Sequence, residues 1–236
     1  INVIVTREPG EDVGTYKLTT SLSPNRNYIA VFAGTATFTI TPATISATDT
    51  DAQVKPNDQT IEFGQTPANF GANFGKDLNK IDLTNADFEF TNNKDQSVST
   101  SVPTDVGEYT ISLTAAAQTA IAKANPNYTF TSDAFLKGIF TINPKATVAN
   151  DATTEITPDS QTITFGETPA DFTATFGDKL NKVILTNEDF MFKQGTTIEN
   201  GVPTDAGSYE ISLTDTAQTK IKNANPNYTF STGDFK

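Results

Sequence analysis

Cysteine, histidine and tryptophan are absent from the 236-residue chain, and methionine occurs once. The absence of cysteine excludes disulfides and thiolate metal sites. The absence of histidine removes the commonest zinc ligand and the usual general base of enzymes. The sequence also has no apolar run of about 18 residues and no charged-then-apolar leader. We therefore expect no membrane insertion and no export signal within this sequence.

Basic residues are scarce. The chain has 16 Lys and Arg against 28 Asp and Glu, which gives a formal net charge of −12. A protein that binds nucleic acid needs a basic surface to neutralise phosphates, so this balance argues against nucleic acid as a partner. The same sign of charge argues against binding to anionic membranes.

What the chain does contain is one phrase written three times. "EDVGTYKL" at 11–18 returns as "TDVGEYTI" at 104–111 and as "TDAGSYEI" at 204–211. A catalytic motif is needed once per active site, whereas a phrase that recurs at a fixed interval is typical of tandem structural repeats. The sequence therefore indicates an architecture more clearly than a chemistry.

The repeats define three predicted domains. Residues 44–144 form one full repeat, and 145–236 form a second copy at an offset of about 100 residues that lacks its last strand. Residues 1–43 match only the C-terminal half of a repeat. We expect 1–43 to be ordered by packing against the next repeat or another chain, and an open edge to lie beside Tyr228 and Phe230.

Apolar residues alternate with polar ones along most of each repeat, as in half-buried strands. Two stretches break this pattern and predict helices at 115–124 and 215–224, with Thr114 and Thr214 as N-caps and Asn-Pro as the stop. The pattern predicts a β-rich α+β fold, with each module β-grasp-like around one helix. An immunoglobulin-like β-sandwich is the alternative.

The repeated phrase is predicted to be a structural turn. In this reading the aspartate starts an Asx-type turn, the glycine supplies a positive φ, and the tyrosine begins an inward-facing strand. Stacking of carbohydrate on the tyrosines is the alternative. The residues concerned are Asp12, Gly14, Tyr16, Asp105, Gly107, Tyr109, Asp205, Gly207 and Tyr209.

No nucleophile-elbow, phosphate-loop or HExxH pattern is present, and we predict that the chain is not an enzyme. The carboxylate pairs Asp87/Glu89 and Glu188/Asp189 resemble the paired acids of glycosidases. Strand alternation, however, places Asp87 and Glu89 opposite the apolar face, where they are solvated. We expect no catalytic residue and no bound cofactor.

Calcium at the repeat junctions is the one cofactor that the residue types suggest. "DTDAQ" at 49–53, and Asn150 and Asp151 followed by Glu155, place oxygen ligands between repeats. Neither segment has the spacing of a calcium-binding loop, and solvated linker charge is the alternative.

The chain closely resembles tandem MBG repeats. Thr6-Arg-Glu-Pro-Gly-Glu-Asp-Val-Gly-Thr-Tyr16, Asn27-Tyr28 and Thr37-Phe-Thr-Ile-Thr-Pro42 resemble the ending of that module, and Ile61-Glu-Phe-Gly64 loosely matches its opening. The resemblance implies a bacterial surface protein, similar to adhesins of lactic acid bacteria. Lys–Asn isopeptide bonds occur in such adhesins, and Lys80 and Lys182 are candidates.

From this resemblance we expect an extracellular, monomeric and extended segment, attached to the cell wall through parts not present here. Two functions stay open. The repeats bind a glycan, mucin or host matrix protein, or they form a purely structural spacer that presents another adhesive domain.

Overall fold

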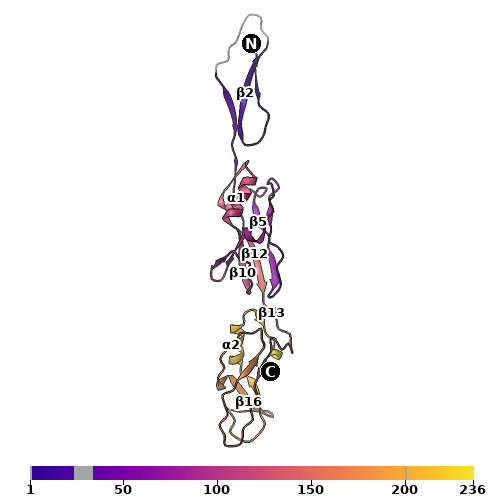
Figure 1. The fold of residues 1–236 in the computed structure, drawn as a ribbon, viewed down its shortest axis with the longest axis vertical. Coiled ribbons are helices and arrows are strands. Elements are labelled where there is room, and N and C mark those ends of the chain that lie inside the picture. Colours follow the sequence, from indigo (N-terminus) through magenta and orange to yellow (C-terminus); the bar gives the residue numbers. More distant parts are fainter. Residues whose placement is uncertain (1, 24–33, 200) are drawn as a thin grey trace. The chain divides into compact units, whose positions relative to one another are not determined.

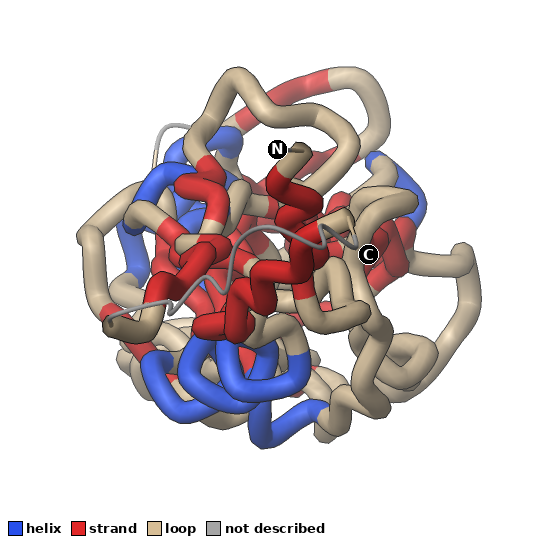
Figure 2. The backbone as a smooth tube through the Cα atoms, turned by 90° about the horizontal axis from the view of Figure 1, so that it is seen from above, coloured by secondary structure: helices blue, strands red, loops and turns tan. Residues whose placement is uncertain are grey.

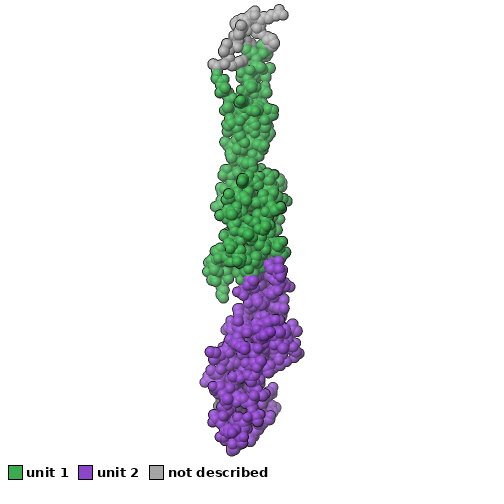
Figure 3. Space-filling view, viewed as in Figure 1, with its two compact units in different colours: residues 1–59, 68–103, 109–140 green, residues 60–67, 104–108, 141–236 purple. Residues whose placement is uncertain are grey.

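The computed structural model describes every residue except 1, 24–33 and 200. It contains two compact units (Figures 1 and 3). The first consists of residues 1–59, 68–103 and 109–140, and the second of residues 60–67, 104–108 and 141–236. Three short segments of the 44–144 repeat, 60–67, 104–108 and 141–144, thus belong to the second unit, and the repeat boundaries stay a prediction.

The N-terminal segment forms an antiparallel sheet of three strands, β1 (Val3–Arg7), β2 (Gly14–Leu22) and β3 (Ala36–Ile40). Tyr16 pairs with Phe38 across β2 and β3, and the Arg7 guanidinium lies over both rings at 5.3 and 5.1 Å. The alternating sequence predicts four strands here. The fourth, at 27–32, lies outside the described residues.

A five-stranded sheet in the order β6-β12-β10-β8-β9 dominates the 44–144 repeat. Its strands are β6 (Gln59–Glu62), β8 (Phe88–Asn92), β9 (Val98–Ser99), β10 (Gly107–Leu113) and β12 (Gly138–Asn143). Two small pairs accompany it, β5 (Val54–Pro56) with β7 (Ala72–Phe74) and β4 (Ala43–Ile45) with β11 (Tyr128–Phe130).

The core of this repeat is built from phenylalanines. Along β10 every second side chain is buried, and Ile111 pairs with Phe90 of β8. Phe70 contacts Phe90 and Phe140 with ring centroids 4.9 and 5.2 Å apart, in edge-to-face geometry. Each fully buried ring of this kind contributes about 2 to 3 kcal/mol to the stability of the fold.

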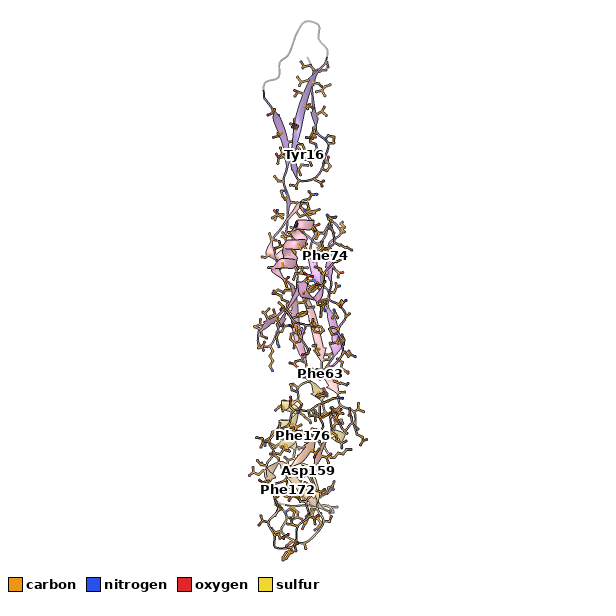
Figure 4. The ribbon with its side chains drawn as sticks, viewed as in Figure 1. Tyr16, Phe63, Phe74, Asp159, Phe172 and Phe176 are labelled. Carbon is orange, nitrogen blue, oxygen red and sulfur yellow. The ribbon has the colours of Figure 1, made fainter. Side chains whose placement is uncertain are left out.

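The third repeat contains corresponding elements. They are β13 (Lys145–Ala146), β14 (Ile156–Pro158), β15 (Ala174–Phe176), β16 (Phe190–Gln194), β17 (Thr197–Ile198), β18 (Glu210–Leu213) and β19 (Tyr228–Thr229). The ring of Phe172 packs against that of Phe192 with centroids 4.7 Å apart, as Phe70 packs against Phe90. Phe172 is labelled in Figure 4. Single 3₁₀ turns lie at Asn85–Asp87, Ser132–Ala134, Asn187–Asp189 and Thr232–Asp234.

Both predicted helices are confirmed at the predicted residues, as α1 (Ala115–Ala124) and α2 (Asp215–Ala224). The Thr114 and Thr214 hydroxyls each accept a hydrogen bond from the backbone N–H three residues later, at 3.2 Å. Strands and loops make up most of the remaining chain (Figure 2). The β-rich α+β class is confirmed, and the finer assignment to a β-grasp stays a prediction.

The asparagine that ends each helix is buried and fully bonded. Asn225 Oδ1 accepts from Asn181 N at 2.6 Å, and its Nδ2 donates to the Asn181 and Ile221 carbonyls at 3.1 and 2.9 Å. Asn125 makes the same three bonds in the other repeat. The asparagine that ends each helix therefore also fixes the helix to the loop that contains Asn79 or Asn181.

The prediction that the missing closing strand leaves an open edge beside Tyr228 and Phe230 is wrong. β19 pairs with β13 in parallel. In the 44–144 repeat the closing strand β12 lies between β6 and β10, so the corresponding edge in the third repeat is that of β18. Among the described strands, β18 pairs only with β16.

Neither α1 nor α2, each of 10 residues, is long and apolar enough to cross a membrane, and the described part of the chain has no other candidate helix.

Candidate functional site

The recurring Asp-Val-Gly turn binds an asparagine far along the chain. In the first compact unit, Asn127 Nδ2 donates to Asp12 Oδ1 at 2.8 Å, and Asn127 Oδ1 accepts from the Val13 backbone N–H at 2.9 Å. The Asn127 carbonyl also accepts from Ala43 N at 3.0 Å. We call this set of three hydrogen bonds the Asp–Asn clasp.

The second compact unit contains the same clasp. Asn227 Nδ2 donates to Asp105 Oδ1 at 3.1 Å, and Asn227 Oδ1 accepts from Val106 N at 2.9 Å. The Asn227 carbonyl accepts from Lys145 N at 3.0 Å. All three hydrogen bonds of the first clasp thus recur at equivalent residues, which indicates that the contact is a regular feature of the repeat.

The tyrosine of the phrase holds the turn in shape. Tyr16 Oη donates to the Asp12 carbonyl at 2.6 Å, and Tyr209 Oη donates to the Asp205 carbonyl at 3.1 Å (Figure 4). In the middle copy, Tyr109 is buried and its ring lies 6.2 Å from that of Phe140. These tyrosines face their own turn or the core, which makes them poor platforms for carbohydrate.

The positive φ expected at the glycine of the phrase is wrong. Among the described glycines, positive φ occurs at Gly10, Gly34, Gly64, Gly166, Gly195 and Gly201, and not at the glycine of any copy. At Gly207 the constraint is space, because an added Cβ would lie 2.4 Å from Gln194 Nε2 and 3.2 Å from the Tyr209 ring. The small residue therefore leaves room for the tyrosine side chain.

After each clasp, the segment that connects one repeat to the next forms a short strand, which pairs in parallel with the strand that begins at the loop tyrosine. β4 pairs with β11 from Ala43↔Tyr128 to Ile45↔Phe130, and β13 pairs with β19 from Lys145↔Tyr228 to Ala146↔Thr229. The asparagine thus bonds the previous turn with its side chain and the connecting strand with its backbone. These are the two places where one repeat meets the next along the chain.

An aromatic contact lies beside the second clasp. Phe63 packs edge-to-face on Tyr228 with ring centroids 5.5 Å apart, and Phe63 N donates to the Asn143 carbonyl at 2.9 Å. Gly64, the next residue, has a φ of +84° that side-chain-bearing residues rarely adopt. The Phe-Gly pair of the repeat opening therefore turns the chain so that Phe63 faces Tyr228.

A pocket of about 320 Å³ adjoins this aromatic pair, within the second unit. Two lysines, a carboxylate and two hydroxyls line it beside the rings. The lining residues are Phe63, Gly64, Lys145, Ala146, Thr147, Val148, Asp151, Thr154, Lys179 and Tyr228. Its mixture of aromatic and polar groups is of the kind that holds small polar ligands.

The carboxylate pairs serve the 3₁₀ turns. Asp87 Oδ2 accepts from Thr84 N and Oγ1, and the pair Asp87/Glu89 is half-buried. Asp189 accepts from Thr186 in the same way and from Lys220 Nζ at 2.7 Å, and it is buried. Burial alone raises the pKa of Asp189, but Lys220 and Thr186 outweigh it and hold that pKa below its usual range.

A general acid needs the opposite shift, so Asp189 is unsuited to that role. Asp159, labelled in Figure 4, is another acid of this repeat with a lowered pKa. Hydrogen bonds from the Thr173 and Thr175 hydroxyls, at 2.6 and 2.7 Å, lower its pKa.

The candidate calcium ligands bond to neighbouring protein groups. Asp49 accepts from Ser46, Asp51 pairs with Lys76 at 2.9 Å, and Asp151 accepts from Thr153 N and Oγ1. Asn150 and Glu155 both contact Lys236. In the part of the chain that the structure describes, no three acidic residues converge as a metal site. Calcium at the junctions and an isopeptide bond at Lys80 or Lys182 stay predictions.

Asn127 and Asn227 are the functional residues that sequence reasoning missed. The signal was present, because Asn-Pro-Asn-Tyr recurs at 125–128 and 225–228 together with the Asp-Val/Ala-Gly phrase. Co-recurrence of two phrases does not reveal that they meet, and it does not reveal that the pairing joins the turn of one repeat to the loop of the next.

The MBG domain family model matches residues 28–144 and 145–236. A solved structure described as a cell surface adhesin from Lactobacillus reuteri is 34% identical over 39% of this chain and 96% of its own, with a TM-score of 0.29. No curated protein matches the chain significantly.

Proposed function

Because the chain belongs to the MBG domain family, we propose that it is a non-enzymatic segment of a bacterial cell-surface adhesin, whose repeats act as a spacer for an adhesive domain. The Asp–Asn clasp carries this proposal, since one turn and one asparagine meet twice in a single chain. The repeated phrase then serves the joint between repeats and needs no ligand.

The chemistry of the clasp suits a joint. Three hydrogen bonds converge on one asparagine, and one of them involves a carboxylate, which strengthens it. Each such bond contributes about 1 kcal/mol net. Bonds on both sides of the connecting Pro-Ala or Pro-Lys segment oppose bending there, which a spacer requires.

The proposal places the segment outside the bacterial cell, attached through other parts of the protein, as a monomer. A glycan and matrix-protein array tests the spacer function. We expect the intact chain to give no saturable signal with glycans, mucin or matrix proteins. A saturable signal contradicts the spacer proposal.

Binding of a host mucus glycan or matrix protein is the second candidate, and the pocket beside Phe63 and Tyr228 favours it. An aromatic face with lysines and hydroxyls around it can stack a sugar ring and bond its substituents. Its volume of about 320 Å³ lies at the small end of the range for ligand pockets, about 300 to 1,000 Å³.

The test of this second candidate is Lys179→Ala, which removes a positive charge from the pocket lining. If the pocket binds a glycan, the variant weakens an array signal at least about tenfold, the loss of one charged hydrogen bond. Lys94→Ala, an exposed lysine outside the pocket, is the matched control. Equal signals from both variants contradict a role for the pocket.

A further inference from the structure

The turn at Asp205–Gly207 is the third copy of the phrase, and among the described residues no side chain or backbone group bonds the Asp205 carboxylate or the Ala206 N–H. Its shape nevertheless matches that of the first copy, because Tyr209 donates to the Asp205 carbonyl as Tyr16 does to that of Asp12. Within the described part of the chain, this turn thus keeps the shape of the first copy and has no bonded asparagine.

The phenylalanine of this repeat that corresponds to Phe63 is also uncovered. Phe165 corresponds to Phe63, and Gly166 has a φ of +90°, close to the +84° of Gly64. Phe63 is half-buried against Tyr228, whereas Phe165 is 75% exposed. An exposed phenylalanine, at the position that packs on the loop tyrosine in the preceding repeat, indicates a surface for a partner.

The covered copies identify the partner. Both clasps bind the second asparagine of an Asn-Pro-Asn-Tyr loop, and the second also places the tyrosine of that loop on Phe63. In both, the asparagine lies 115 to 122 residues after the aspartate, in the following repeat. The Asp205 carboxylate, the Ala206 N–H and the Phe165 ring are the equivalents of the groups that bind this loop in the second clasp.

We infer that Asp205, Ala206 and Phe165 form a docking surface for the Asn-Pro-Asn-Tyr loop of an MBG repeat placed next in tandem. The loop asparagine donates to the Asp205 carboxylate and accepts from Ala206 N–H, and the loop tyrosine packs on Phe165. This inference rests on the clasp geometry and holds whether the repeats act as a spacer or bind a ligand.

The test extends the protein with a copy of its own residues 137–236 after Lys236, in register, and follows amide hydrogen exchange. We expect exchange of the Ala206 amide to slow at least about tenfold, toward the rate of Val106, because the amide becomes hydrogen-bonded. Asp205→Ala in the extended chain reverses the protection at Ala206 and leaves Val106 unchanged, and Asp105→Ala does the opposite.

A second extension, with a copy of 137–144 alone, supplies the closing strand without the loop. Ala206 stays unprotected in that chain if the inference is right. Protection by the strand alone overturns it, as does unchanged Ala206 exchange while the helix amides of the added repeat are protected. Concentration-dependent protection in the unextended chain also overturns it, since the occupant is then a second copy.

Discussion

At the residue scale, the 44–144 and 145–236 repeats differ at sites that are otherwise equivalent, and these differences isolate single interactions. Asp87 and Asp189 cap the same 3₁₀ turn through Thr84 and Thr186. Residue 120 is alanine and residue 220 is lysine, so only Asp189 gains an ammonium partner. The contribution of Asp189 to stability therefore depends on its ion pair with Lys220, whereas that of Asp87 does not depend on such a pair.

We predict that Asp189→Asn lowers the free energy of unfolding by about 2 kcal/mol at pH 7, since a buried carboxylate loses its charged partner. The folded-state pKa of Asp189 is depressed, so its contribution is complete above the unfolded pKa of about 3.9 and disappears as pH falls through the folded pKa. Urea unfolding of both proteins from pH 7 to pH 3 measures this difference.

The stabilities of the two proteins should begin to converge as pH falls below about 4, and the difference should shrink further toward the folded-state pKa of Asp189. Asp87→Asn is the control and should produce a smaller change with less dependence on pH. A gap between wild type and Asp189→Asn that persists unchanged at pH 3 contradicts the role of the Lys220 ion pair.

Asn225 gives a second prediction at this scale. Replacement by alanine leaves the Asn181 backbone and the Ile221 carbonyl without their side-chain partner in a buried site. We expect a loss of about 3 kcal/mol in unfolding free energy. Asn223→Ala, at an exposed position in the same helix, should change stability by less than about 0.5 kcal/mol in the same denaturant titration.

At the element scale, the loops that open each repeat are fixed by backbone contacts to a glycine. Gly75 N donates to the Gln53 carbonyl and Gly177 N to the Glu155 carbonyl, both at 2.8 Å. An added Cβ would lie 2.2 Å from Asp51 O or 2.3 Å from Thr153 O. The loops that contain the candidate calcium ligands are thus packed against the ends of β7 and β15.

Gly177→Ala should therefore separate this loop from β15. We expect a loss of more than about 2 kcal/mol, because the obstructing atoms are backbone and must move. Gly233→Ala is the control, since its added Cβ would make an ordinary contact at 3.7 Å. Equal thermal midpoints for the two variants, measured by calorimetry, contradict the packing argument.

The elements were predictable where local periodicity decides them. The helices at 115–124 and 215–224 and the strand at Tyr109–Leu113 follow from side-chain spacing alone. The strand that closes the sheet was misplaced, because pairing between distant strands leaves no local signal. The glycine of the phrase was misread for a related reason, since φ is not positive in any copy and the tight contact at Gly207 is with the ring of Tyr209, at 3.2 Å from an added Cβ.

At the scale of the whole molecule, the first segment joins the rest through few contacts. Its described sheet is mostly exposed, and Val3, Ile4 and Val5 are each more than half exposed. The clasp of Asp12 and Val13 with Asn127 is therefore a large part of what connects this sheet to the first full repeat.

Removal of residues 1–41, which keeps β4 intact, should lower the thermal midpoint of the first unit by a few degrees. One to two hydrogen bonds are worth about 1 to 2 kcal/mol, and about 1 kcal/mol shifts a domain of this size by roughly 4 to 8 °C. Asn127→Ala in the whole chain should reproduce much of the shift. An unchanged midpoint and cooperativity in both proteins means that the segment contributes nothing to the stability of its neighbour.

Each full repeat carries an aspartate turn and an asparagine loop, and each clasp uses one from each of two repeats. Such a contact is heterologous, because the turn of one repeat meets the loop of the next. Unequal recombination between the coding segments could add or remove a whole repeat and leave every remaining joint chemically intact. The length of the protein can then change in evolution in steps of one repeat, with no compensating substitution at any interface.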